Sequence, residues 1–442
     1  MLFSNKDLTK LMIPLIIEQL LAITVGFADT LMVSTVGEMA VSAVSLVDTI
    51  NILLINVFAA LGTGGAVVVA QFIGQGSFEK ARYSAKQLLL ITALLSVIIM
   101  FFVIIFNNYL LHLVFGKVEI NVMKNAEIYF FYSAMSYPFI ALYNSGAALF
   151  RAVGNSKISM INSAIMNIIN IVLNAFFIFG CHWGVFGAVL ATLIARAVAC
   201  LVILIMLSKK SSELYIDDYV HWKFDFTYIR KILTIGIPSG LENGMFQLGK
   251  ILVQGLVATF GTYSIAANAV SSNLSQMQII PGMALGLAMV TVIGQCVGAN
   301  DYEQAKYYIK KIMKMTYLSM LILIVVLLLA TPTILTFYSL SQETIALAYQ
   351  CIFFHGISAA IFWPAAFTLP NALRAANDAK YTMIVSATSM LTFRLLLSYI
   401  IAQTMGVGLL GIWIAMSIDW VVRAIFFIWR YFNGKWMNRQ LV

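Results

Sequence analysis

Long apolar stretches occupy almost the whole of this 442-residue chain, and they decide what it can fold into. A stretch of about 20 apolar residues is long enough to cross the hydrocarbon core of a bilayer as a helix. The chain is 61% hydrophobic and only 10% charged, which leaves too little polar surface for a water-soluble fold of this size. The sequence therefore predicts an all-α, polytopic membrane protein.

The apolar runs are separated by breaks rich in Gly, Asn and charged residues, and they predict twelve transmembrane helices. Their approximate ranges are 8–35, 42–74, 86–110, 121–149, 156–180, 185–208, 231–258, 265–297, 309–337, 344–370, 381–404 and 408–431. We expect an amino-terminal lobe at residues 1–208, a linker at 209–230 and a carboxy-terminal lobe at 231–442. The linker is too short to build a soluble domain of its own.

Positive charge is distributed unevenly between the two sides of the predicted membrane helices. Most of the 27 Lys and Arg residues lie on the side of the linker and the termini, whereas the opposite loops hold only Lys117 and Lys124. Because cytoplasmic loops are enriched in Lys and Arg, we expect both termini and the linker in the cytoplasm, and the chain in the plasma (inner) membrane. The net charge of +9 then reflects topology, so membrane lipids and not nucleic acid are the expected partners.

The two halves of the chain match each other at an offset of 224 residues. Pro14 aligns with Pro238 and Glu18 with Glu242, and the matches continue to the end of the second helix and resume in the sixth. Six helices per half is an even number, so both halves enter the membrane from the same side. Such parallel repeats are typical of secondary transporters, in which a site between the halves is exposed alternately to each side.

Several stretches of the sequence resemble the multidrug and toxic compound extrusion (MATE) family. They are GFADTLMVSTVGE, VVVAQFIGQGSFEKAR, RAVGNSK and NIINIVLNAFFIFG in the first half, and GIPSGLENGMFQLGK, TVIGQCVGANDYEQAK and LRAANDAK in the second. The resemblance implies a MATE-type fold and a cation-coupled antiporter that exports amphipathic, often cationic, organic compounds. We expect it to bind small organic cations and to work as a monomer.

Ionisable residues inside the spans are candidate functional groups, because a charge in the bilayer needs a partner or water. Asp29 lies in the outer half of the first helix, where Gly26 and Ala28 leave room beside it. We interpret Asp29 as the cation-coupling group, and a structural hydrogen bond to Thr or Asn is the alternative. The resemblance implies the same role, because family members carry an essential acid in this context.

Three amides recur along the fifth predicted span. Asn167, Asn170 and Asn174 have the spacing i, i+3 and i+7, which places them on one helix face. This face is interpreted as a polar lining that, with Thr192, hydrates Asp29 or coordinates a cation, and an interhelical amide zipper is the alternative. Family members often carry Asp at the position of Asn174, so its replacement argues against a tight sodium site.

Glu18 and Glu242 each follow a helix-breaking proline by four residues. The resemblance associates Glu242 with cation binding or drug transport. Glu18 lies on the same helix stripe as Asp29 and is either part of a proton relay or hydrogen-bonded to the loosened backbone near Pro14. Lys250 either neutralises a carboxylate or extends towards the membrane surface.

Four further charged residues have simpler interpretations. Asp419 and Arg423 have i,i+4 spacing and predict a structural ion pair. Arg394 aligns with Asn170 in the repeat and could play the corresponding part in the second lobe. Asp48 lies near the outer start of its helix and is interpreted as interfacial.

The substrate surface is predicted from flexible thioethers and aromatic rings, which suit variable hydrophobic cations. Candidate lining residues are Met245, Phe246, Met277, Met283 and Met289. Ordinary helix packing is the alternative for each.

Motifs for enzymatic chemistry are missing from the sequence, which contains neither a GxxxxGKS/T loop nor HExxH nor GxSxG, and its four Cys have no metal-ligand spacing. We expect neither an enzyme nor a cofactor or metal site. The alternative transporter is a flippase of a related superfold for lipid-linked precursors, which needs several cations in its cleft, and a passive channel ranks third. Protons are favoured over sodium as the coupling cation, because Asp29 is predicted to stand alone among neutral amides.

Overall fold

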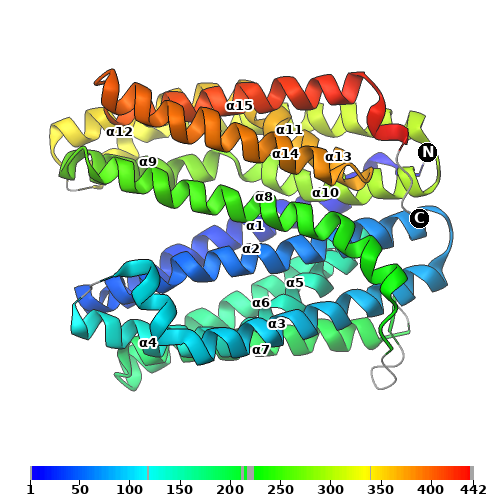
Figure 1. Cartoon of the computed structure of the whole chain (residues 1–442), viewed down its shortest axis with the longest axis horizontal. Helices are drawn as coiled ribbons and strands as arrows, with labels where there is room; N and C mark the ends of the chain where they lie inside the picture. Colours follow the sequence, from blue (N-terminus) through cyan, green and yellow to red (C-terminus); the bar gives the residue numbers. More distant parts are fainter. Residues whose placement is uncertain (1, 117–118, 211–213, 217–222, 339, 439–442) are drawn as a thin grey trace. The chain divides into compact units, whose positions relative to one another are not determined.

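The computed structural model describes residues 2–116, 119–210, 214–216, 223–338 and 340–438. All regular secondary structure in these ranges is helical, as predicted (Figure 1). The first half contains α1 (Asn5–Ser34), α2 (Glu38–Gly74), α3 (Phe78–Phe115), α4 (Ile120–Met135), α5 (Tyr137–Ala152), α6 (Ser156–Ala175), η1 (Phe176–Gly180) and α7 (Gly184–Ser208).

The second half begins with α8 (Phe226–Ala258), α9 (Thr262–Gln278), α10 (Ile280–Gly298), α11 (Tyr302–Thr336) and α12 (Gln342–Trp363). It continues with η2 (Pro364–Thr368), α13 (Leu369–Ala375), α14 (Ala379–Ser389), η3 (Met390–Leu396), η4 (Tyr399–Thr404), α15 (Leu409–Phe432) and η5 (Lys435–Asn438). The segments η1 to η4 are π-helical, and η5 is a short 3-10 helix.

Each of the twelve predicted spans corresponds to one helix or to consecutive helical segments. Within the described residues, ten segments are long and apolar enough to cross a membrane. The predicted span 121–149 is broken at Ser136 into α4 and α5, and 265–297 is broken at Ile279 into α9 and α10. Both breaks precede a proline in the first turn of the next helix, where its missing N–H costs no hydrogen bond.

The described chain divides into two compact units. One comprises Phe3–Gly240, and the other comprises Leu2 and the described residues from Leu241 onward. The boundary between the units falls inside α8, because the start of α8 packs closely on α2. The two backbones are so close that a Cβ atom added at Gly64 of α2 would lie 2.5 Å from the carbonyl oxygen of Ile232 on α8. The predicted linker, 209–230, includes residues 211–213 and 217–222, which lie outside the described residues. Lys117 and both chain ends also lie outside them. The lobe boundaries and the position of the termini therefore stay predictions.

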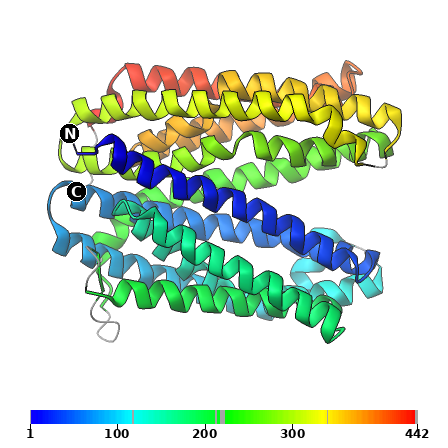
Figure 2. The same ribbon diagram turned by 180° about the vertical axis from the view of Figure 1, so that it is seen from behind.

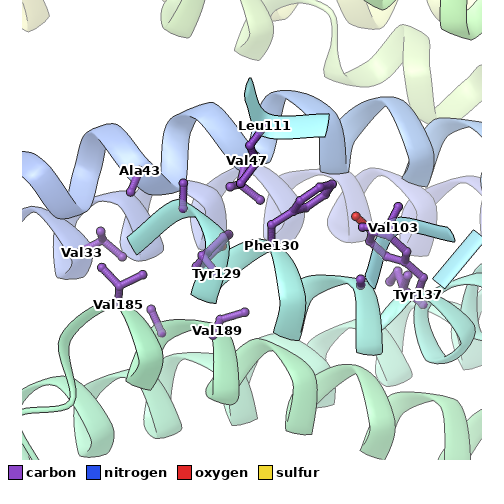
Figure 3. Close-up of a cluster of buried hydrophobic side chains, with 14 of the residues drawn as sticks. Val33, Ala43, Val47, Val103, Leu111, Tyr129, Phe130, Tyr137, Val185 and Val189 are labelled. Atoms are coloured by element: carbon purple, nitrogen blue, oxygen red, sulfur yellow. The ribbon is translucent and has the colours of Figure 1, made fainter. Parts of the chain in front are cut away.

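In the first unit, α1 lies against α6 and α6 against α7 (Figure 2). A hydrophobic core contains side chains from α1, α2, α3, α4, α5 and α7 (Figure 3). Its largest members include Phe130 and Tyr137. Val33 from α1 lies at one end of this core with Ala43 from α2 and Val185 from α7, and Tyr129 from α4 lies nearer its middle. The core therefore fixes the helices whose polar residues form the candidate site.

In the second unit, α9 packs on α12, α10 on α11 and α13, and α12 on α15. One core cluster lies between α8, α9, α12 and α15, and a second contains Trp363 and Trp420. Three π-helical segments interrupt this unit, at η2, η3 and η4. Single π-helical turns occur frequently at functional sites.

Candidate functional site

Asp29 accepts hydrogen bonds from the amide face of α6. Asn174 Nδ2 donates to Asp29 Oδ1 at 2.7 Å. The Asn170 amide satisfies its neighbours when its nitrogen faces Asp29: it then donates to Oδ1 at 2.7 Å and Oδ2 at 3.2 Å, and its oxygen accepts from Thr192 Oγ1 at 3.1 Å. The structure thus brings together Asp29, Asn170, Asn174 and Thr192.

The amide face of α6 buries Asn162, Asn167, Asn170 and Asn174. Asn162 Nδ2 donates to the Ala199 carbonyl of α7 at 2.9 Å, so this end of the face joins helices. At the other end the amides turn to Asp29. The structure shows that the face forms hydrogen bonds between helices, while its role in hydrating Asp29 or coordinating a cation stays a prediction.

A cavity opens beside Asp29, and it contains a second carboxylate. Its lining includes Asp29, Asp48, Tyr129, Asn174 and Thr192. Both Asp side chains are half-buried. The interpretation of Asp48 as an interfacial residue is therefore wrong, and so is the expectation that Asp29 stands alone. The cavity is acidic.

The Asp48 carboxylate is held by α2 itself and by α4. Asn51 Nδ2 donates to Asp48 Oδ1 at 3.1 Å, and the Tyr129 hydroxyl donates to the same oxygen at 3.4 Å. Asn51 Oδ1 in turn accepts from the Tyr137 hydroxyl at 2.8 Å. Arg196 on α7 is near enough to act electrostatically on both carboxylates, and its Nη1 donates to Ser136 at 2.7 Å. Hydrogen bonds from core residues thus hold the Asp48 carboxylate in place at the acidic cavity.

Glu18 and Glu242 occupy equivalent settings in the two units. Glu18 lies 3.2 Å from Arg151 Nη1 and accepts from the Ser159 hydroxyl at 2.7 Å. Glu242 lies 2.7 Å from Arg374 Nη2. It also accepts from the hydroxyls of Ser386 at 2.6 Å and Thr382 at 3.3 Å. Each acid is therefore held by an arginine, a partner that the sequence analysis did not assign, while a role of either acid in transport stays a prediction.

The predicted ion pair of Asp419 with Arg423 is confirmed, with Arg423 Nε 2.9 Å from Asp419 Oδ1. Lys250 is half-buried. Its Nζ lies 5.3 Å from the centre of the Phe246 ring, and within the described residues it forms no ion pair. The structure therefore does not show Lys250 neutralising a carboxylate.

The predicted substrate-lining residues differ in exposure. Met245, Phe246 and Met277 are half-buried, and Met283 is 40% exposed. Met289 is completely buried in α10, so it packs in the core of its unit and does not line a surface in this structure. Met277 packs against the core between α9 and α12.

A family model, MatE, matches residues 14–176 and again 238–400. Both ends of the second match lie 224 residues after those of the first, which confirms the register of the internal repeat. The chain belongs to the MATE family. It is therefore a transporter of the MATE multidrug efflux family rather than an enzyme.

The transporter resembles other MATE proteins over nearly its whole length. It is 27% identical to "Uncharacterized transporter YisQ" of Bacillus subtilis, covering 97% of this chain and 94% of that protein. It is 25% identical to "Probable multidrug resistance protein YoeA" of the same organism, over 92% and 88% of the two chains. A solved outward-facing structure of a multidrug resistance MATE family transporter has the same fold, with a TM-score of 0.91 at 22% identity over 98% and 97%.

Proposed function

We propose that this MATE transporter is an antiporter that couples proton entry to the export of amphipathic organic compounds, with Asp29 and Asp48 as the coupling pair. The single observation that carries the proposal is the acidic cavity, in which two half-buried carboxylates share one lining. Repulsion between two carboxylates close together favours the binding of one positive charge. An export cycle can use that uptake and release to favour one conformation over the other.

The orientation of the amides favours a proton over sodium. Asn174 presents its amide nitrogen to Asp29, and Asn170 does so in the orientation that satisfies its neighbours; these donors would repel a metal cation. Sodium would require both amides to turn their oxygens inward. A proton needs no such rearrangement, because it binds directly to a carboxylate oxygen. The preference for a proton is therefore supported by the amide orientation and no longer by an isolated Asp29.

Organic cations are the proposed substrates, attracted by the acidic cavity, and relatives named as multidrug resistance proteins support export over lipid flipping. Both termini are proposed to face the cytoplasm, with the chain working as a monomer in the plasma membrane. Glu242 and Glu18, each held by an arginine, are proposed to position helices α8 and α1 beside the transport path rather than to bind the coupling ion.

Gradient-driven efflux from liposomes tests this proposal. The purified transporter is reconstituted, loaded with ethidium, and given either a pH gradient without sodium or a sodium gradient at equal pH with a protonophore. Export is expected with the pH gradient only. Robust export driven by sodium and unchanged between about pH 6 and 8 would refute proton coupling, whereas a lipid-linked precursor that moves while ethidium does not would favour the flippase.

A further inference from the structure

The interior of the second unit contains more positive than negative charge. Its three buried acids are each within 3 Å of one arginine: Glu242 with Arg374 at 2.7 Å, Asp378 with Arg430 at 2.6 Å and Asp419 with Arg423 at 2.9 Å. Two cations are left over, Lys250 and Arg394, and the described part of this unit offers no further buried acid to neutralise them. Two positive charges inside a membrane unit need a counter-charge or water.

The two left-over cations, Lys250 and Arg394, both lie beside the ring of Phe246. The Nζ of Lys250 lies 5.3 Å from the ring centre, and the Cζ of Arg394 lies 5.2 Å from it. Arg423 approaches the same ring at 5.7 Å. Arg423 is already paired with Asp419, and one aromatic ring cannot neutralise Lys250 and Arg394, since each cation–π contact supplies only a fraction of an ion pair.

Arg394 also has unused hydrogen-bond donors. The residue is 8% exposed, and neither its Nε nor its Nη1 has a hydrogen-bond partner within the described residues. Arg423 binds Oδ1 of Asp419, and the Asp419 Oδ2 atom lies 3.9 Å from Nη1 of Arg394, an ion-pair separation longer than a hydrogen bond. Buried polar groups are nearly always satisfied in folded proteins, so the Nε donor of Arg394, which this ion pair leaves without a partner in the described residues, points to a ligand.

The backbone brings Lys250 and Arg394 together at a close helix contact. Met390 precedes Arg394 by one turn on the π-helical segment η3, and a Cβ atom added at Gly249 would lie 1.9 Å from the Met390 side chain. Glycine at this position leaves room for the Met390 side chain between α8 and η3. Lys250 follows that glycine directly, so the contact sets its position beside η3.

The internal repeat places the same positions at the acidic cavity of the first unit. At the offset of 224 residues, Lys250 aligns with Gly26 and Arg394 aligns with Asn170. Gly26 lines the cavity, and Asn170 donates to Asp29. Positions that surround an acid in one unit therefore carry bases in the other.

We propose that the second unit contains a binding site for the oxyanion of an amphipathic ligand, formed by Lys250 and Arg394 beside Phe246. The guanidinium donates two parallel hydrogen bonds to a carboxylate or phosphate, and the ammonium adds a point charge. The rings of Phe246 and Phe367, whose centres are 6.0 Å apart, contact the apolar body of the ligand. This site goes beyond the proposed function and does not depend on proton coupling.

Direct binding measurements test the site without any gradient. The full-length transporter in dodecyl maltoside is titrated with 1-pyrenebutyrate, an aromatic carboxylate, and with 1-pyrenebutanol, which has the same ring system and no charge. We expect the carboxylate to bind at least about tenfold more tightly. Farnesyl pyrophosphate is the third probe, and its displacement of 1-pyrenebutyrate would identify a lipid-linked phosphate as the source of the oxyanion, whereas failure to displace would identify a free carboxylate.

Variants locate the binding to these two residues. Lys250→Met and Arg394→Met are each expected to weaken 1-pyrenebutyrate at least about tenfold and to leave 1-pyrenebutanol unchanged. Lys314→Met is the matched control, because Lys314 is exposed on α11 and its loss should change neither probe. Equal affinity for the two pyrenes, or full affinity in Lys250→Met, would overturn the proposal. The pyrene pair decides the matter on the unmodified protein if Arg394→Met fails to fold.

Discussion

The two units of this transporter share a repeat and differ in the charge of their interiors. In the first, Asp29 and Asp48 line a common cavity, with neutral amides around them. In the second, Lys250 and Arg394 lie beside one aromatic ring at positions that the repeat aligns with that cavity. The duplicated fold thus preserves the place of a site while its chemistry changes, since function resides in side chains placed on a fold.

A second comparison shows what both units retain. Each has a proline followed four residues later by a glutamate, and each glutamate pairs with an arginine and accepts from a hydroxyl. Because the same arrangement stands in both units despite their opposite interior charges, we infer that it serves a task common to both. Holding the first helix of each repeat in position is such a task.

The largest effect is expected from removing the acids of the first unit. Asp29→Asn should abolish gradient-driven ethidium export while expression and fold are retained, because an amide keeps the shape and cannot cycle between charged and neutral states. Asp48→Asn should slow export about tenfold, or about 1.4 kcal/mol of activation free energy, since it removes the repulsion that favours cation uptake. Both rates are measured in the same liposomes.

Glu38→Gln is the control for these variants, because Glu38 lies on α2 with Asp48 but is exposed and outside the cavity. Its export rate should equal that of the unmodified transporter. Full export by Asp29→Asn would remove Asp29 from the mechanism. Full export by Asp48→Asn would leave the first unit with one working acid and weaken the contrast between the units.

A smaller and symmetric effect is expected from the two glutamates. Glu18→Gln and Glu242→Gln each leave a largely buried arginine without its carboxylate, at a cost of about 3 kcal/mol. For units of this size that corresponds to a fall in melting temperature of roughly 6 to 12 °C, measured by thermal unfolding in detergent. Similar falls in both variants support a shared structural role. If Glu242→Gln melts normally yet loses drug transport, Glu242 acts on substrate or cation instead.

The sequence predicted the fold more completely than the site, and particular residues show why. The amide face of α6 could be predicted because helix geometry alone fixes i, i+3 and i+7. Asp48 was misread because its direction depends on how α2 packs against α4, where Tyr129 contacts it. A signal was present, since Asp48 and Asn51 stand one turn apart in an apolar helix and hydrogen-bond to each other. The breaks at Ser136 and Ile279 were missed because the apolar runs continue across them.

The basic cluster of the second unit was also beyond sequence reasoning. Lys250 and Arg394 are far apart in the chain, and only the contact between Gly249 and Met390 places them at one ring. The repeat offset pairs each with a residue of the acidic cavity, but that pairing gains meaning only once the cavity is known.

The smallest change expected concerns the ion preference of the acidic cavity. Asn174→Asp replaces a donor to Asp29 with a third carboxylate in the lining of the cavity. The added charge and the lost N–H should raise sodium affinity, because sodium requires several oxygens with net negative charge close by. We expect sodium to stimulate ethidium export a few-fold in this variant and not in the unmodified transporter, at fixed and symmetric pH with protonophore. Asn167→Asp, on the same face, is the control, because Asn167 is not among the residues that line the cavity. If sodium also stimulates export by Asn167→Asp, a negative charge anywhere along α6 is enough to produce a response to sodium. The amide nitrogens beside Asp29 would then not determine the preference for protons.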